Sequence, residues 1–275
     1  MHKGMEKKIV TKFVYFVFGL TIISFNVSAS DIYLTYGAHD LIVSSENSNT
    51  FGVDIGIIGE GMTDTGVLLN GSFTMLLDYD EDKLDPDHEP VWFKTNAQAK
   101  KEIYQLSPTI GFDWLTRFDG SSNTVSAVED QVKLFTGMGA VYKTSDINLG
   151  LKVLAGYYFL EIDDDVPRIY GYDRSDLQNN TGAYTLMADS EIRLNPNIKV
   201  YARIQRWNNS VEWLENQYEL LLSYDSNKWI KGSTLSIDTE HIQYNLDPYQ
   251  KPGFAPIIPW NNHTLVRAYI TVPWK

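Results

Sequence analysis

Charged side chains recur at alternate positions inside apolar segments of this 275-residue chain. In residues 198–204, Lys199 and Arg203 alternate with Ile, Val and Ala side chains. The charged residues placed in this way carry both signs and comprise Asp113, Lys133, Lys152, Asp189, Glu191, Lys199, Arg203, Glu215, Glu219, Asp238, Glu240 and Arg267. Such a set suits a charged constriction that selects permeating solutes by charge and orientation. It suits equally well a group of internal ion pairs that fills a narrow polar interior.

The elements that position these side chains are expected to be β-strands, because successive side chains on a strand point to opposite faces. Alternation over eight or more residues, repeated along the chain, is the strand signal. On two neighbouring strands we expect Lys199 and Arg203 to sit opposite Glu219 and Glu215, respectively.

Eleven alternating segments are clear, and short and long connections between them alternate along the chain. The long connections are expected at 79–101, 162–180 and 245–262. Bacterial single-chain barrels have an even number of strands, short periplasmic turns and long outer loops. One further strand is therefore expected inside the first long connection, around residues 90–95.

The last strand carries the clearest pattern. In residues 263–275, the apolar residues Val266, Ala268, Ile270, Val272 and Trp274 share one face, with polar residues on the other. This segment resembles the closing strand of Gram-negative outer-membrane β-barrels, which usually ends on an aromatic residue, whereas Lys275 follows Trp274 here. The resemblance implies that these five residues form the assembly signal. It also implies contact with periplasmic chaperones, the barrel-assembly machinery, outer-membrane lipid and lipopolysaccharide.

The fold expected for residues 31–275 is all-β, a closed antiparallel transmembrane β-barrel of about twelve strands, with ten as the alternative count. A soluble β-sandwich would also alternate, but its strands are usually nearer five or six residues than the roughly 10–16 seen here. Aromatic residues near the strand ends also predict two interfacial girdles, with Tyr157, Tyr184, Trp207 and Tyr244 among those at the outer side.

The N-terminal segment predicts export from the cytoplasm. Four lysines precede the apolar run 13–25, and small residues at 27–29 form a cleavage site. We expect residues 1–30 to be a signal peptide and the mature chain to lie in the outer membrane of a Gram-negative bacterium.

Composition excludes several kinds of chemistry. The chain has no Cys, so neither disulfides nor thiolate catalysis are available. A net charge of −12 without a basic patch argues against nucleic acid. The acidic stretches 78–89 and 161–165 offer carboxylates to divalent cations, but neither has the spacing of an EF-hand loop. We therefore predict no metal site and no cofactor.

Histidines are the residues most able to support catalysis in this chain. His39 and His88 each precede an acidic residue, but neighbours on a strand face opposite ways. His241 and His263 are expected near each other at the outer rim, with His241 toward lipid and Ser236 on its strand. Because no Gly-x-Ser-x-Gly or His-Glu-x-x-His motif occurs, we predict no catalytic residues and no enzyme.

The function expected from this pattern is a small porin-like channel for passive passage of small hydrophilic solutes. In length and layout the chain resembles several families of twelve-stranded outer-membrane channels, and its excess of acidic residues disfavours polyanions. Two alternatives remain open. One is a closed barrel that acts through its extracellular loops in adhesion, reception or envelope structure. The other is a lipid A or phospholipid modifying enzyme at the outer rim.

Overall fold

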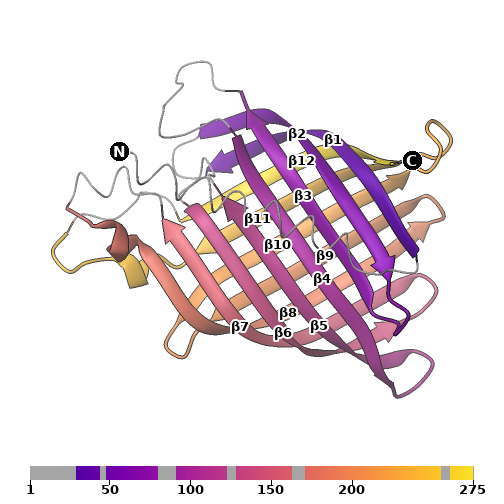
Figure 1. Ribbon diagram of the computed structural model, residues 1–275, viewed down its shortest axis with the longest axis horizontal. Coiled ribbons are helices and arrows are strands. Elements are labelled where there is room, and N and C mark those ends of the chain that lie inside the picture. The colour runs from indigo at the N-terminus through magenta and orange to yellow at the C-terminus, as the bar shows by residue number, and fades with distance from the viewer. Residues whose placement is uncertain are drawn as a thin grey trace.

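The chain folds into a barrel in the computed structural model, which describes residues 29–43, 48–79, 91–122, 128–162, 171–254 and 261–274. Within these residues twelve antiparallel strands follow one another around the ring, and β1 closes it by pairing with β12 (Figure 1). The strands are β1 (Ala29–Val43), β2 (Ser48–Met62), β3 (Leu68–Asp78), β4 (Val91–Gln105), β5 (Ile110–Ser122), β6 (Val128–Lys143), β7 (Ile147–Ile162), β8 (Gln178–Asn195), β9 (Ile198–Asn208), β10 (Trp213–Asp225), β11 (Thr234–Tyr244) and β12 (Asn262–Pro273). The predicted fold class and the count of twelve are confirmed.

The strand that alternation left unclear is β4, which begins where it was expected. The long connection predicted at 79–101 was wrong in its length, because β4 takes up residues 91–105 and a tight turn over 106–109 leads into β5. The positions of β4 that alternate with Lys94 and Lys100 include Thr95 and Lys101, so the apolar face is weak in the sequence. Its inward positions carry Lys94 and Lys100, which line the interior.

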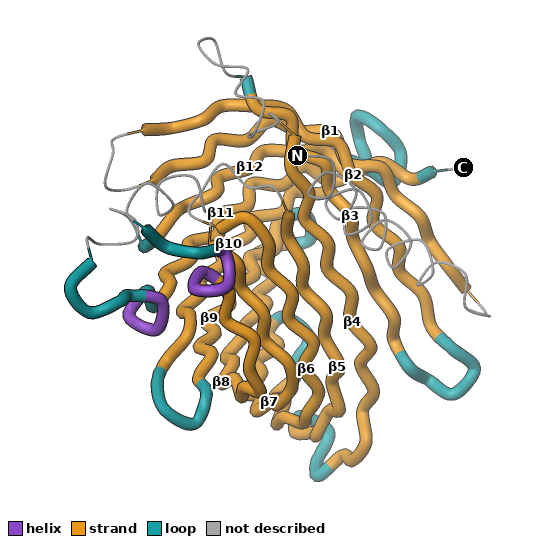
Figure 2. The backbone as a smooth tube through the Cα atoms, turned by 60° about the vertical axis from the view of Figure 1, so that its left-hand side comes forward, coloured by secondary structure: helices purple, strands orange, loops and turns teal. Residues whose placement is uncertain are grey.

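The two ends of the barrel differ in their connections. The turns at 63–67, 106–109, 144–146 and 196–197 share one end, together with a longer turn at 226–233 that was predicted to finish at 228. The opposite end carries the 3-10 helices η1 (Arg174–Leu177) and η2 (Asp247–Tyr249), drawn in purple in Figure 2. Because short turns face the periplasm in such barrels, we name these the periplasmic end and the outer end.

The outer face of the sheet is apolar. Val53, Leu151, Leu186, Leu220 and Ile237 each expose half or more of their side-chain surface, and residues beside them in sequence face inward. Exposure of such an apolar surface to water is unfavourable, whereas the hydrocarbon core of a bilayer accommodates it. The closed sheet also pairs the backbone groups of its strands, as the bilayer interior requires. Among the described residues no helix is long and apolar enough to cross a membrane.

The predicted aromatic girdles are confirmed in part. Tyr157 and Tyr184 are exposed on the outer face, but Trp207 and Tyr244 are buried in the interior, at 1% and 2% exposure. Their positions on β9 and β11 share the parity of inward Arg203 and Glu240, so the alternation itself places them inside.

The interior is not polar throughout. Near the outer end, inward residues of β6 to β11 join residues of the outer connections in a buried group that we call the outer apolar cluster. It contains Val128, Tyr158, Leu160, Ile162, Tyr172, Leu177, Trp207, Leu214, Ile242, Tyr244 and Tyr249. A smaller group, Leu41, Leu76, Trp92 and Leu265, lies at the outer ends of β1, β3, β4 and β12. The expectation of a polar inward face on every strand was therefore wrong at this end, where both faces are apolar and alternation fades.

Candidate functional site

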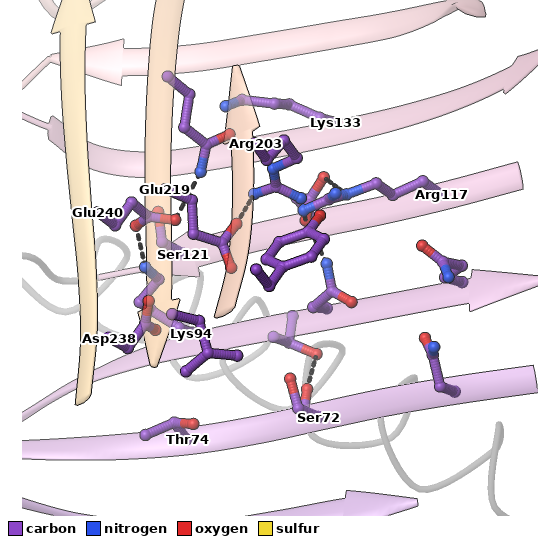
Figure 3. A pocket seen from close by; sticks show the side chains of 18 of the residues that line it. Ser72, Thr74, Lys94, Arg117, Ser121, Lys133, Arg203, Glu219, Asp238 and Glu240 are labelled. Atoms are coloured by element: carbon purple, nitrogen blue, oxygen red, sulfur yellow. Dashed lines mark hydrogen bonds and ion pairs between the residues drawn. The ribbon is translucent and has the colours of Figure 1, made fainter. Parts of the chain in front are cut away.

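The barrel encloses a cavity of about 540 Å³. Inward side chains from all twelve described strands line it, and most of them are charged or amide residues (Figure 3). A space of this size is in the range of pockets that hold small molecules. The cavity lies below the outer apolar cluster and is the candidate functional site.

Basic and acidic side chains lie on different parts of the inner surface of the barrel, which we call the basic wall and the acidic wall. Inward basic residues gather on β4 to β7, where they are Lys94, Lys100, Arg117, Lys133 and Lys152. Inward acidic residues gather on β8 to β11, where they are Asp189, Glu191, Glu215, Glu219, Asp238 and Glu240. Asp113, Asp119 and Arg203 are exceptions, each within an ion pair on its own side. The two walls therefore set up a transverse field across the cavity.

Several ion pairs stay within one part of the wall. Lys100 Nζ lies 2.7 Å from Asp113, and Arg117 Nε lies 2.6 Å from Asp119. Arg203 binds Glu219 at 2.6 Å on the adjacent strand. Such pairs are expected where charges must satisfy one another away from bulk water.

Two ion pairs join strands that lie four or more places apart in the ring. Lys94 on β4 binds Glu240 on β11, nearly opposite it in the ring (Figure 3). Lys133 on β6 binds Glu215 on β10, which also accepts hydrogen bonds from Gln131 at 2.7 Å and Tyr158 at 3.1 Å. These side chains cross the interior, so the path at their level is narrow.

The acidic wall contains one poorly compensated group. Glu219 and Glu240 are directly opposite each other in the register of β10 and β11, and Asp238 lies one inward position away. Asp238 Oδ1 is buried and has no hydrogen-bond partner among the described residues. Like charges opposite each other on paired strands are unfavourable. Lys94 and Arg203 offset two of these three carboxylates.

The predicted charged residues are thus brought together, with one exception. Lys199 is exposed near the periplasmic end and does not line the cavity, whereas Glu191 is exposed there but does line it. The predicted facing pairs were wrong by four residues in the register of β9 and β10. Arg203 is opposite Glu219, while Lys199 is opposite Ser223 and Glu215 is opposite Trp207. The remaining pairs are Lys152 with Asp189 and Arg267 with Asp54 at 2.7 Å. The selectivity role of these residues stays a prediction.

The sequence analysis missed the buried site that His39 forms with two acidic residues. His39 Nε2 lies 2.7 Å from Asp78, and Nδ1 lies 3.7 Å from Asp54, all on β1 to β3. The Trp92 indole donates to the same Asp78 oxygen at 3.2 Å. The signal was present, since these residues share inward parity, but their contact depends on the register of three strands. Asp40, the sequence neighbour of His39, faces the other way, as expected.

The rim histidines do not form one site. His241 is on the outer face, where Nδ1 lies 2.9 Å from Thr264 Oγ1. His263 is buried inside, with its ring 5.7 Å from that of Tyr244, and Ser236 is also inward. The expectation that His241 faces lipid agrees with the structure, but the sheet separates it from His263 and Ser236.

No cluster of three or more possible metal ligands occurs within the part of the chain that the structure describes. The acidic stretches 80–89 and 163–165 lie outside the described residues, as does the predicted signal peptide up to residue 28. Val266, Ala268, Ile270 and Val272 face away from the cavity on β12, and Trp274 follows the end of that strand. The role of these five residues in assembly stays a prediction.

Two of the outer connections, the one that carries η1 and the one that carries η2, touch each other above the cavity. Lys251 forms an ion pair with Asp176, and the hydroxyl of Tyr172 accepts hydrogen bonds from Gln250 Nε2 at 2.9 Å and Lys251 N at 3.3 Å. The rings of Tyr172 and Phe254 lie 5.4 Å apart. We call these residues the outer clasp. The hydrogen bond from Lys251, with one from the Asp173 backbone, lowers the pKa of Asp176.

No family model matches the chain, and no curated protein matches it. Among solved structures it is similar to the KdgM porin in complex with disordered oligogalacturonate, at 10% identity and TM-score 0.46, over 90% of this chain and 100% of that one. It is similar to the NanC porin at 9% identity and TM-score 0.47, over 87% and 99%. It is similar to outer membrane phospholipase A from Escherichia coli at 12% identity and TM-score 0.42, over 92% and 96%. These matches include both porins and an enzyme and do not choose between them.

Proposed function

We propose that this protein is a small channel of the Gram-negative outer membrane for passive passage of small hydrophilic solutes. The observation that carries the proposal is the cavity of about 540 Å³ inside a closed sheet, lined by charged and amide side chains. A barrel that only anchored extracellular loops would gain nothing from an enclosed polar space, because unpaired buried polar groups are costly.

The ends of the cavity suggest how passage is controlled. Toward the periplasmic end the inward residues Glu191 and Lys199 are exposed to solvent. Toward the outer end Ile162, Leu177 and Tyr249 are at most 4% exposed, so apolar side chains restrict the path there. Apolar constrictions in channels gate by excluding water. We infer that movement of the outer connections opens the path.

The test is solute influx into liposomes that contain the refolded mature chain. Erythritol, a small neutral polyol, should enter faster than it enters protein-free liposomes. Raffinose, a trisaccharide of a size close to the whole cavity, should enter at the protein-free rate. Equal rates for erythritol with and without inserted protein would contradict the proposal.

A second candidate function rests on the contact between His241 and Thr264. A hydroxyl hydrogen-bonded to an imidazole on the lipid-facing surface is the pairing that activates a nucleophile in acyl transfer. No third group that orients His241 through its other nitrogen occurs among the described residues. We expect no fatty acid release from phospholipid or lipid A by the wild type. Release that His241→Ala abolishes would replace the channel proposal with an enzyme.

A further inference from the structure

We propose that the cavity prefers zwitterionic solutes, which carry an ammonium group and an acidic group a few bonds apart, over solutes with a charge of one sign. This inference rests on the proposed channel function and specifies its substrate class. It starts from the sorting of lumenal charges into a basic wall on β4 to β7 and an acidic wall on β8 to β11.

The ion pair between Lys94 and Glu240 is the movable part of the arrangement. Their side chains keep 28% and 12% exposure, so a solute in the cavity can reach both. Lys133 and Glu215 are 3% and 0% exposed, and Gln131 and Tyr158 hold the carboxylate further. The pair of Lys133 and Glu215 is therefore a fixed part of the cavity wall. A solute that passes through the cavity must separate Lys94 from Glu240.

Separation of Lys94 from Glu240 leaves two charges that need new partners. A zwitterion supplies both, because its acidic group can accept from Lys94 while its ammonium group donates to Glu240. An anion leaves Glu240 without an ionic partner, held only by the hydrogen bond from Gln217 at 2.5 Å. A cation leaves Lys94 without an ionic partner, and either loss is costly in a partly buried site. Asp238 strengthens attraction for the ammonium group on the acidic wall, because its Oδ1 has no partner among the described residues.

Two pairs of matched solutes test the preference by tracer efflux from liposomes in symmetrical salt. Taurine and isethionate differ only in an ammonium group against a hydroxyl. Glycine betaine and choline differ in a carboxylate against a hydroxymethyl group. We expect each zwitterion to leave about fivefold faster than its singly charged partner, the ratio that ~1 kcal/mol of a partly exposed ion pair gives.

The variants assign the preference to the crossing pair. The double variant Lys94→Gln and Glu240→Gln should bring both ratios close to one. Lys143→Gln is the matched control, because Lys143 pairs with Glu102 at 3.5 Å on the periplasmic rim, outside the cavity lining. It should leave both ratios as they are in the wild type.

The outcomes separate the two proposals. If erythritol and all four tracers stay inside wild-type liposomes, the channel itself is refuted. If erythritol passes but the wild type carries each singly charged solute as fast as its zwitterionic partner, the preference is refuted and the channel stands. The comparison within the wild type needs no variant to fold. Ratios retained in a folded double variant would refute the role of Lys94 and Glu240.

Discussion

Single residues decide how closely the strands of this barrel pack around buried charges. Gly52 on β2 is the clearest case, because a Cβ there would lie 2.3 Å from Leu77 O and 2.6 Å from the His39 ring. The missing side chain leaves room for His39 between Asp54 and Asp78. A backbone oxygen cannot move aside as the tip of a flexible side chain can.

Gly52→Ala should therefore lower the free energy of unfolding by about 1–3 kcal/mol, the usual cost of overpacking. Gly182→Ala is the matched control on β8, since a Cβ there meets nothing within 4 Å. Urea titration of Trp fluorescence in lipid vesicles measures both variants. Equal stability of the two would show that the strands near His39 adjust without cost.

A second prediction at this scale concerns a buried lysine. Lys133→Ala leaves Glu215 fully buried without its ion partner, although Gln131 and Tyr158 still donate to it. Loss of one member of a buried pair costs about 3–5 kcal/mol. Lys143→Ala removes a half-exposed pair and should cost less than ~1 kcal/mol. The same urea titration measures both, and a small effect of Lys133→Ala would mean that the Glu215 site is hydrated.

At the scale of elements, the two outer connections act together through the outer clasp. Lys251 is central, because it binds Asp176 and lies with its Nζ 5.5 Å from the centre of the Tyr172 ring. Tyr172, Leu177 and Tyr249 pack into the outer apolar cluster behind it. The outer clasp therefore links the outer apolar cluster, which covers the cavity, to the connections that carry η1 and η2.

Lys251→Ala should raise the rate of erythritol influx, because it removes the ion pair with Asp176 and loosens the contact with Tyr172.

The lowered pKa of Asp176 means that the stability of its contact with Lys251 depends on pH. A carboxyl whose pKa is lower in the folded state stabilises that state above its ordinary pKa, about 4, and loses this contribution below it. Influx through the wild type should thus be constant from pH 8 to about 5 and rise only in stronger acid. Asp176→Asn should remove that rise, and an unchanged pH profile would refute the role of the ion pair.

The sequence predicted elements better than contacts between them. The alternation of apolar and polar residues predicted the strands and which charged residues face inward. This works because every second residue of a strand in a membrane-spanning barrel faces lipid. It did not give the length of β4, whose outward face is weak, or the register that puts Arg203 opposite Glu219. The site of His39 depends on two successive registers, and the pair of Lys94 with Glu240 depends on closure of the whole ring. Neither of these contacts is encoded locally.

The whole molecule combines an apolar outer surface, a polar cavity and an apolar cover at one end. Acidic residues outnumber basic ones, and the net charge of the chain is −12. The field of such a chain raises the local concentration of cations around the mouths of the barrel. A path through the cavity should therefore conduct small cations somewhat better than small anions.

The central claim is that the polar cavity is part of a continuous path across the membrane. The most direct measurement is single-channel conductance of the refolded mature chain in a planar bilayer under a salt gradient. We expect discrete openings with a reversal potential of the sign for mild cation preference, and more frequent openings in Lys251→Ala. Insertion of folded protein without conductance, in the wild type and in Lys251→Ala alike, would contradict it.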